Sequence, residues 1–204
     1  RYLMVKGILK ISQISKIYFS KHTVIALFLI LLFSYSSLIK TESYAVASRH
    51  HLATDIGMKV LEEGGNAIDA AVAIAFALSV VNPSAGNLGG GGFMLLHLAD
   101  KNETFSIDYR ERAPIKSNEK MFQDNSGKVI EGLSLNSILA SGVPGTVAGM
   151  FYASEKFGTI NIEALINPSI ELARKGFILS EFQAKNFNKY KKKFSKNKEA
   201  KEIF

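Results

Sequence analysis

The chain contains few side chains that could carry out catalysis. None of its 204 residues is a cysteine, which excludes a thiol nucleophile, a thiolate zinc site, an iron–sulfur cluster and disulfide bonds. His50 and His51 are adjacent, so on a helix they point about 100° apart and cannot both bind one metal ion, and His97 stands alone. We therefore predict no metal site. Serine and threonine remain as nucleophiles, but no Gly-x-Ser-x-Gly sequence is present to expose one.

Arg110, which is flanked by Glu111 and Arg112, is a candidate for binding the carboxylate of a small ligand. These residues follow directly after a predicted strand, in Asp108-Tyr-Arg-Glu-Arg-Ala-Pro114. A guanidinium at the end of a strand can hold a carboxylate through two parallel hydrogen bonds. From the residue types alone, a salt bridge between Arg110 and Glu111 is the favoured interpretation.

A run of glycines, Gly86-Asn-Leu-Gly-Gly-Gly-Gly92, could also serve a site. It is not a phosphate-binding loop, because no Lys-Ser or Lys-Thr follows it. It is not a dinucleotide fingerprint either, because it lies after a helix and before a strand, the reverse of that motif. We expect a structural loop that needs positive φ angles and close backbone packing. The alternative is a loop that lines a ligand pocket.

The elements that must position these residues are helices and one pair of strands. Residues 49–63 predict an amphipathic helix that ends at Gly64-Gly65, since glycine tolerates the left-handed turn at a helix end. Because helices and strands are segregated along the chain, the predicted fold class is α+β. The other expected elements are a first strand at 44–48, helices at 67–81, 146–157 and 162–175, and hairpin strands at 93–98 and 104–109.

Asp69 lies inside the most apolar of these helices, AIDAAVAIAFALSVV at residues 67–81. A helix that is apolar on all sides is buried, and a buried carboxylate needs hydrogen-bond donors. Asn66 is well suited to cap this helix. We therefore expect the N–H groups and the dipole of the helix start to stabilise the Asp69 carboxylate.

The charge lies at the two ends of the chain. The net charge is +7, of which residues 1–22 contribute +5 and residues 185–204 contribute +6, which leaves −4 for residues 23–184. A mildly acidic globular middle argues against nucleic-acid binding, which needs positive charge on the folded face that meets phosphate. We expect the lysine-rich residues 189–198 to form a solvated helix or loop.

Residues 1–40 predict a targeting segment. A basic stretch precedes residues 24–33, which are apolar without a break, and small residues follow. The apolar stretch falls short of the ~20 residues that a spanning helix needs, as is typical of a secretory signal. We expect export to the periplasm or the extracellular space, with an uncleaved amino-terminal membrane anchor as the alternative.

Four stretches, in their order and spacing, resemble a known family: EGGNAIDAA at 63–71, GNLGGGGFM at 86–94, DYRERAP at 108–114 and GVPGTVAG at 142–149. With them, residues 44–204 resemble the amino-terminal part of the large subunit of the γ-glutamyltransferases (γ-glutamyltranspeptidases, glutathione hydrolases). The resemblance implies a four-layer αββα N-terminal-nucleophile hydrolase fold, of which this chain forms an incomplete part.

The resemblance also implies a reaction. Family members cleave themselves, and the new amino-terminal threonine attacks the γ-glutamyl amide of glutathione or a related donor, after which the acyl group passes to water or an amino acid. No metal and no organic cofactor is implied. Arg110 matches the family arginine that binds the donor α-carboxylate, and Glu111 is expected to orient it. The glycine run matches a structural element of the family and not its oxyanion hole.

The resemblance assigns no catalytic residue within the chain. The family's nucleophile follows a Thr-Thr-His-type motif, which does not occur in this sequence, and Thr146, at a predicted helix start, is not a candidate. We expect the nucleophile beyond Phe204, in the small subunit. The small subunit and the remainder of the large subunit are the expected partners of this chain, and we expect the chain alone to be inactive. The alternatives are a β-lactam acylase-like relative and the inert truncated product of a broken gene.

Overall fold

The computed structural model describes residues 25, 28, 44–85 and 88–203. The chain divides into two compact units, residues 1–44 and 45–204, and the helices and strands described below belong to the second. The predicted targeting segment, residues 1–40, lies outside the described residues except for Ile25 and Phe28. Within the described ranges, no helix combines the length and the apolar character needed to cross a bilayer.

Most of the expected helices and strands are confirmed. Those predicted at 67–81, 93–98, 146–157 and 162–175 have the predicted bounds, and those at 49–63 and 104–109 differ by one or two residues. In chain order the elements are α2 (His51–Glu62), α3 (Ala67–Val81), β1 (Phe93–Leu98), β2 (Glu103–Asp108), α4 (Leu133–Asn136), the 3₁₀ helix η2 (Ile138–Ala140), α5 (Thr146–Phe157), α6 (Ile162–Lys175), α7 (Glu181–Phe194) and α8 (Lys198–Ile203).

The first strand expected at 44–48 is wrong. A strand needs a neighbouring strand to which its backbone can bond, and in the described part of the chain β1 and β2 pair only with each other. One apolar side chain of this segment, that of the half-buried Val46, packs against a helix instead. Val46 lies against α2 at Gly57, where a Cβ on the glycine would come within 3.2 Å of it.

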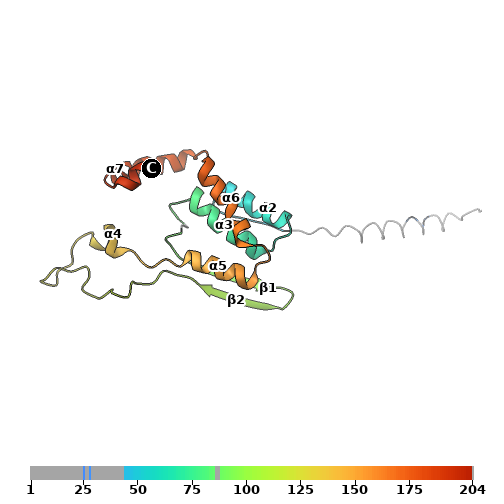
Figure 1. The fold of residues 1–204 in the computed structure, drawn as a ribbon, viewed down its shortest axis with the longest axis horizontal. Coiled ribbons are helices and arrows are strands. Elements are labelled where there is room, and N and C mark those ends of the chain that lie inside the picture. The colour runs from blue at the N-terminus through green and yellow to red at the C-terminus, as the bar shows by residue number, and fades with distance from the viewer. Residues whose placement is uncertain (1–24, 26–27, 29–43, 86–87, 204) are drawn as a thin grey trace, which may run out of the picture. The chain divides into compact units, whose positions relative to one another are not determined.

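β1 and β2 form an antiparallel hairpin with one buried and one exposed face. Because side chains alternate along a strand, Leu96 and Ile107 face the helices and are buried, whereas Phe93 and Leu95 face outward and are 62% and 77% exposed. The hairpin lies beside α5, and the chain leaves β2 toward the long loop that contains α4 (Figure 1). The hairpin thereby fixes the point at which the loop that carries Arg110 begins.

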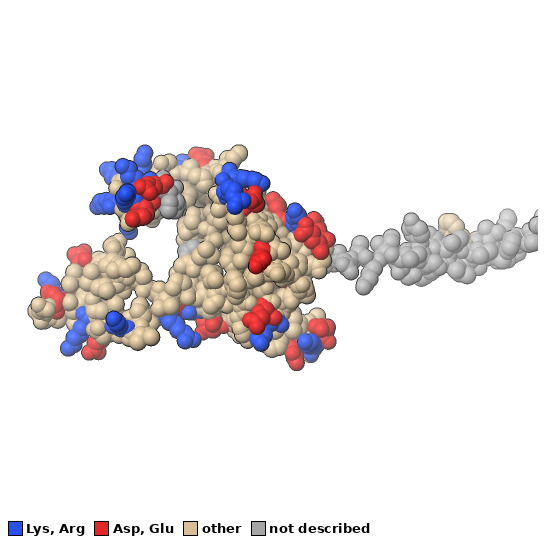
Figure 2. Space-filling model, in the orientation of Figure 1, with Lys and Arg blue, Asp and Glu red and all other residues tan. Residues whose placement is uncertain are grey.

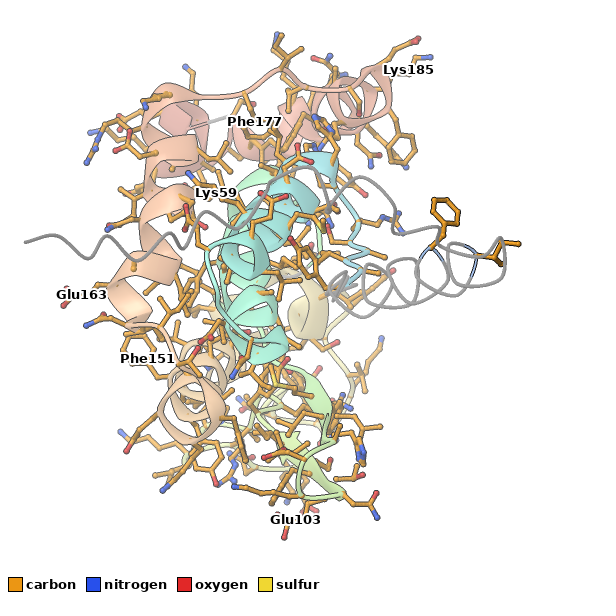
Figure 3. All side chains as sticks on the ribbon, turned by 90° about the vertical axis from the view of Figure 1, so that its right-hand side faces the viewer. Lys59, Glu103, Phe151, Glu163, Phe177 and Lys185 are labelled. Atoms are coloured by element: carbon orange, nitrogen blue, oxygen red, sulfur yellow. The ribbon has the colours of Figure 1, made fainter. Side chains whose placement is uncertain are left out.

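α3 is the central element of the core. Eight of its fifteen residues are buried, and it packs against α2, α5 and α6 (Figure 1). Charged side chains such as those of Lys59 and Glu163 point away from this core (Figure 3). The expectation that this helix is buried is confirmed for these eight residues, while the others are covered only in part and Ala67 is exposed. Its apolar partners in one cluster include Leu96 of β1, Ile107 of β2, Met150 of α5 and Leu165 of α6.

Asn66 and Asp69 cap the start of α3 reciprocally. The Asn66 side-chain oxygen accepts hydrogen bonds from the N–H groups of Ile68 and Asp69 at 2.8 and 3.0 Å. The fully buried Asp69 carboxylate in turn accepts the Asn66 N–H at 2.9 Å. This is a capping box. The predicted cap at Asn66 and the predicted role of the helix start in stabilising Asp69 are confirmed.

The same carboxylate also binds the loop between α5 and α6. Thr159 donates its N–H to Oδ1 at 3.0 Å and its hydroxyl to Oδ2 at 2.6 Å, and the Ile160 N–H reaches Oδ1 at 3.3 Å. The Asn66 side-chain amide donates to the Phe157 carbonyl at 2.7 Å. The buried charge is thus surrounded by donors, and it ties the start of α3 to the end of α5.

Replacing Asp69 by asparagine tests this tie. The amide keeps the shape but presents N–H donors to the N–H and hydroxyl donors that now surround the carboxylate, so Asp69→Asn should lower the free energy of unfolding by about 2–4 kcal/mol. Urea denaturation followed by circular dichroism measures the change. Asp100→Asn, in the exposed hairpin turn, is the matched control and should stay within about 0.5 kcal/mol. Equal stability of the two variants would contradict the assignment.

Candidate functional site

The residues after β2 are held by backbone hydrogen bonds from two other segments. The Tyr109 N–H donates to the Gly92 carbonyl at 3.0 Å, and the Gly92 N–H donates back at 3.4 Å, which continues the hairpin ladder. Three residues further on, the Arg112 N–H donates to the Val143 carbonyl at 3.2 Å, and the Arg112 carbonyl accepts the Val143 N–H at 2.8 Å. Arg110 lies between these two attachments, so the backbone beneath its side chain is fixed on both sides.

Three glycines allow these segments to lie so close together. A Cβ on Gly91 would be 2.6 Å from the Tyr109 carbonyl oxygen and 2.7 Å from the Glu111 nitrogen. A Cβ on Gly145 would overlap the same carbonyl oxygen, and one on Gly149, one helical turn further along, would overlap the Tyr109 ring. Any side chain at these positions would push the backbone of residues 109–111 away from its place.

The glycine run serves this packing and not a left-handed turn. Its described glycines, 89–92, have no positive φ angle, so that part of the expectation is wrong, while the close packing is confirmed. The Gly90 carbonyl also accepts the N–H groups of Gly145 and Thr146 at 2.9 and 3.0 Å, at the start of α5. What the loop requires here is the absence of a side chain and not an unusual backbone angle.

Thr146 is the first residue of α5, so its predicted place at a helix start is confirmed.

Arg110, Glu111 and Arg112 are exposed and line an open cavity of about 480 Å³. Among the described residues, neither Arg110 nor Glu111 has an ion-pair partner, so the salt bridge favoured by the residue types does not form. The segment is paired at both ends, and neighbouring side chains along such a segment diverge. The Arg110 N–H is itself held by the Asp108 carboxylate at 3.0 Å.

The chemistry that this cavity offers is anion binding. A guanidinium without an ion-pair partner presents a planar fork of N–H donors that matches a carboxylate, and Arg112 adds a second positive charge. The lining residues also include the hydroxyl groups of Ser117 and Ser141, but no histidine that could act as their base. The cavity can therefore hold and orient an acid, and in the described chain neither hydroxyl is hydrogen-bonded to a group that could act as its base.

Sequence reasoning missed Tyr109 as the residue that positions Arg110. Its ring packs against α5 at Gly149, and its hydroxyl donates to the Phe93 carbonyl at 3.4 Å. Burial raises the pKa of the Tyr109 phenol above its ordinary value. The available signal was the spacing of Gly145 and Gly149, one turn apart on a helix, which marks a surface that a bulky side chain approaches closely.

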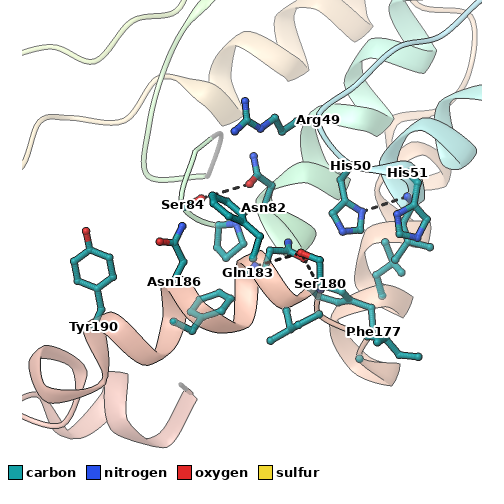
Figure 4. A pocket seen from close by; sticks show the side chains of 18 of the residues that line it. Arg49, His50, His51, Asn82, Ser84, Phe177, Ser180, Gln183, Asn186 and Tyr190 are labelled. Carbon is teal, nitrogen blue, oxygen red and sulfur yellow. Dashed lines mark hydrogen bonds between the residues drawn. The ribbon is translucent and has the colours of Figure 1, made fainter.

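A second and larger cavity, of about 1300 Å³, lies where the starts of α2 and α7 meet the ends of α3 and α6 (Figure 4). His50 caps α2 by accepting the Leu52 N–H on Nδ1 at 3.3 Å. Partial burial and the neighbouring His51 lower the pKa of His50, while hydrogen bonding with Gln183 opposes that shift. The neutral ring suits the cap, because a protonated ring cannot accept a hydrogen bond.

Across the described ranges, no group of three or more His, Cys, Asp or Glu side chains is placed so that it could hold a metal ion.

Residues 53–204 match the family model described as Gamma-glutamyltranspeptidase. The chain belongs to the gamma-glutamyltranspeptidase family. It is 52% identical, over 143 residues and 70% of this chain, to a glutathione hydrolase proenzyme of Pseudomonas sp. (strain A14). The solved γ-glutamyltranspeptidase of Helicobacter pylori matches 82% of this chain with a TM-score of 0.77 and 49% identity. The resemblance carried by the four sequence motifs is confirmed.

The chain spans about a quarter of the length of the curated relatives that it matches, 25% for the Pseudomonas sp. proenzyme. It covers 48% of the chain in the Helicobacter pylori transpeptidase structure. A cephalosporin acylase from Bacillus halodurans matches 78% of this chain with a TM-score of 0.60 at 22% identity, a likeness of fold alone. The described α+β structure therefore corresponds to part of the chains in these transpeptidase and acylase structures.

Gly145→Ala tests how this transpeptidase-family chain holds Arg110. The added methyl group meets the Tyr109 carbonyl oxygen, which is backbone and cannot rotate away, so the variant should lose about 1–3 kcal/mol of stability. It should also speed hydrogen exchange at the amides of Arg112 and Val143. Ala148→Ser, on the exposed side of α5, is the control and should leave both measurements unchanged. Wild-type exchange at both amides in Gly145→Ala would show that the glycine does not position the loop.

Proposed function

We propose that this chain is the amino-terminal part of the large subunit of an enzyme that cleaves γ-glutamyl amides, with glutathione as the typical donor. Membership of the gamma-glutamyltranspeptidase family supports the substrate class. The observation that carries the proposal is the exposed Arg110 guanidinium, without an ion-pair partner in the described chain, on a backbone fixed at Tyr109 and Arg112. Such a group is preorganised to receive a carboxylate.

In this proposal Arg110 binds the α-carboxylate of the γ-glutamyl donor through two parallel N–H···O bonds. Glu111 lines the same cavity, and in this proposal its carboxylate orients the Arg110 guanidinium when the donor is bound. Holding the amino-acid end of the donor places its γ-carbonyl at a fixed distance from Arg110, which lowers the entropic cost of the attack that follows.

The attacking group lies outside this chain. In the proposed complete protein, self-cleavage creates an amino-terminal threonine, whose own α-amine takes the hydroxyl proton as the oxygen attacks the γ-carbonyl. The amide C–N bond breaks and the leaving amine takes up a proton. The resulting threonine ester is then attacked by water or by the amine of an amino acid, which releases glutamate or a new γ-glutamyl compound.

The same proposal explains the exposed face of the hairpin and gives residues 1–40 a role. The hairpin exposes Phe93 and Leu95 on the face away from the helices, as expected of a sheet that further layers cover. The remainder of the large subunit and the small subunit would supply those layers and complete a four-layer αββα sandwich. Residues 1–40 would direct the protein out of the cytoplasm, as a secretory signal or as an amino-terminal anchor.

Two other hypotheses about the function have weaker support. A β-lactam acylase-like relative would share the fold, but identity to the cephalosporin acylase is 22% against 49% for the Helicobacter pylori transpeptidase. The inert product of a broken gene is distinguished by reading the coding DNA past Phe204. An open frame that reaches a Thr-Thr-His-type motif supports the enzyme, and an immediate stop codon supports the inert product.

Arg110→Ala in the complete protein tests the proposed site. Loss of a bidentate charged contact costs about 2–5 kcal/mol, so kcat/KM for glutathione should fall by about 30-fold or more, mainly through a higher KM. Arg110→Lys, which keeps the charge and loses the fork, should recover only part of the loss. Arg174→Ala, an exposed arginine of α6 that does not line the cavity, is the control. An unchanged KM in Arg110→Ala rules out the assignment.

A further inference from the structure

The most concentrated charge in the chain lies in and just after α7. Residues 185–198 contain seven lysines and no acidic residue, so this short segment carries +7. Figure 2 shows basic side chains gathered where Figure 1 places α7, with acidic side chains near them. None of the residues of α7 is buried. The γ-glutamyl site described above makes no use of this charge.

Four of these lysines share one side of the helix. Lys185, Lys189 and Lys192 follow each other at spacings of four and three residues, which places them on one face, and Lys196 continues the row in the turn after α7. This lysine face, about 16 Å long at 1.5 Å per residue, is fully exposed. Lys185 is paired with Glu181 at 2.8 Å.

The other three members of the lysine face have no carboxylate partner. Among the described residues, none of the ion pairs involves Lys189, Lys192 or Lys196. Like charges at these spacings repel each other, and no ion pair in the described chain offsets the charge of these three lysines. The Lys189 ammonium lies 5.7 Å from the ring centre of Tyr190.

The opposite side of α7 faces the protein. Phe187, Tyr190 and Phe194 line the larger cavity, together with Gln183, which donates to the Val81 carbonyl at 2.7 Å (Figure 4). None of the four residues of the lysine face lines that cavity. The helix therefore turns these three rings toward the cavity, which Lys193 also lines, and turns the lysine face away from it.

We propose that the lysine face of α7 docks the protein on an anionic phospholipid surface. A straight, exposed row of lysines fits a flat surface of negative headgroups, to which each lysine contributes about a fivefold gain in binding, or ~1 kcal/mol. A nucleic acid would favour arginine forks and aromatic rings for stacking on the same face. α7 contains no arginine, and three of its four rings, at 187, 190 and 194, lie on the other side. The fourth, the exposed Phe182, lies on the row of Lys185 and Lys189, so the lysine face offers one ring and not the successive rings on which a single-stranded nucleic acid stacks.

A local fluorescent reporter tests the contact. The chain contains no tryptophan, so Asn188→Trp, at an exposed position of α7, introduces a single donor for energy transfer to dansyl-labelled lipid in vesicles. Vesicles of equal parts phosphatidylglycerol and phosphatidylcholine should give transfer, and vesicles of phosphatidylcholine alone should give much less. Transfer should be lost near 1 M salt, where the screening length falls to about 3 Å.

Charge-changing variants of the reporter chain locate the contact. Lys189→Glu/Lys192→Glu/Lys196→Glu should weaken binding to the anionic vesicles on the order of 100-fold. Because glutamate is unfavourable in the last turn of a helix, the same three positions are also changed to glutamine, with a smaller loss expected and unchanged circular dichroism. The matched control makes the same change of charge at three exposed lysines elsewhere, as Lys101→Glu/Lys116→Glu/Lys120→Glu, and should bind like the parent.

The outcomes separate the lysine face from the rest of the molecule. The basic residues before residue 24 are identical in every variant, so they cannot produce a difference between the two triple variants. Equal binding by the parent and both lysine-face variants overturns the proposal. The proposal is also overturned if the parent chain does not bind anionic vesicles but its tryptophan emission changes on addition of single-stranded DNA. The lysine face would then bind a nucleic acid. Neither result bears on γ-glutamyl cleavage, which Arg110→Ala tests separately.

Discussion

The loop that carries Arg110 can lie where it does only because Gly91, Gly145 and Gly149 have no side chains. Each of these glycines faces Tyr109 or its neighbours at a distance that a Cβ could not occupy. The glycine-rich loop, the hairpin end and the start of α5, which are far apart in sequence, therefore share one small volume. Backbone hydrogen bonds from Gly92 and Val143 then hold the segment on either side of Arg110.

The buried Asp69 carboxylate supports the same arrangement from the other end of α5. It fixes the loop after α5 to the start of α3 through Thr159 and Ile160. α5 is thereby held at its end by a charged hydrogen-bond network and at its start by the Gly90 carbonyl. Its position sets the place of Tyr109, and Tyr109 precedes Arg110. One line of contacts thus runs from the core helix to the exposed guanidinium.

The sequence predicts the elements well and their contacts poorly, for a physical reason. Helix periodicity and caps such as Asn66 are local, so α3, α5 and α6 could be placed at their bounds from the residues alone. The Thr159 and Ile160 partners of Asp69 lie 90 and 91 residues away, and no local pattern indicates them. The strand expected at 44–48 failed because alternation does not provide a neighbouring strand. The place of Arg110 at the end of a strand made it a candidate and the family motif gave it a role, whereas the part played by Tyr109 follows only from the contact of its ring with α5.

A crystal structure of the complete protein with a γ-glutamyl donor bound tests the central claim most directly. The fixed backbone on either side of Arg110 predicts that its guanidinium donates two parallel hydrogen bonds to the donor α-carboxylate, each about 2.7–2.9 Å long. The same structure should keep Tyr109 packed on Gly149 of α5. A donor whose α-carboxylate is held by other residues, with the Arg110 side chain turned away from it, would contradict the account.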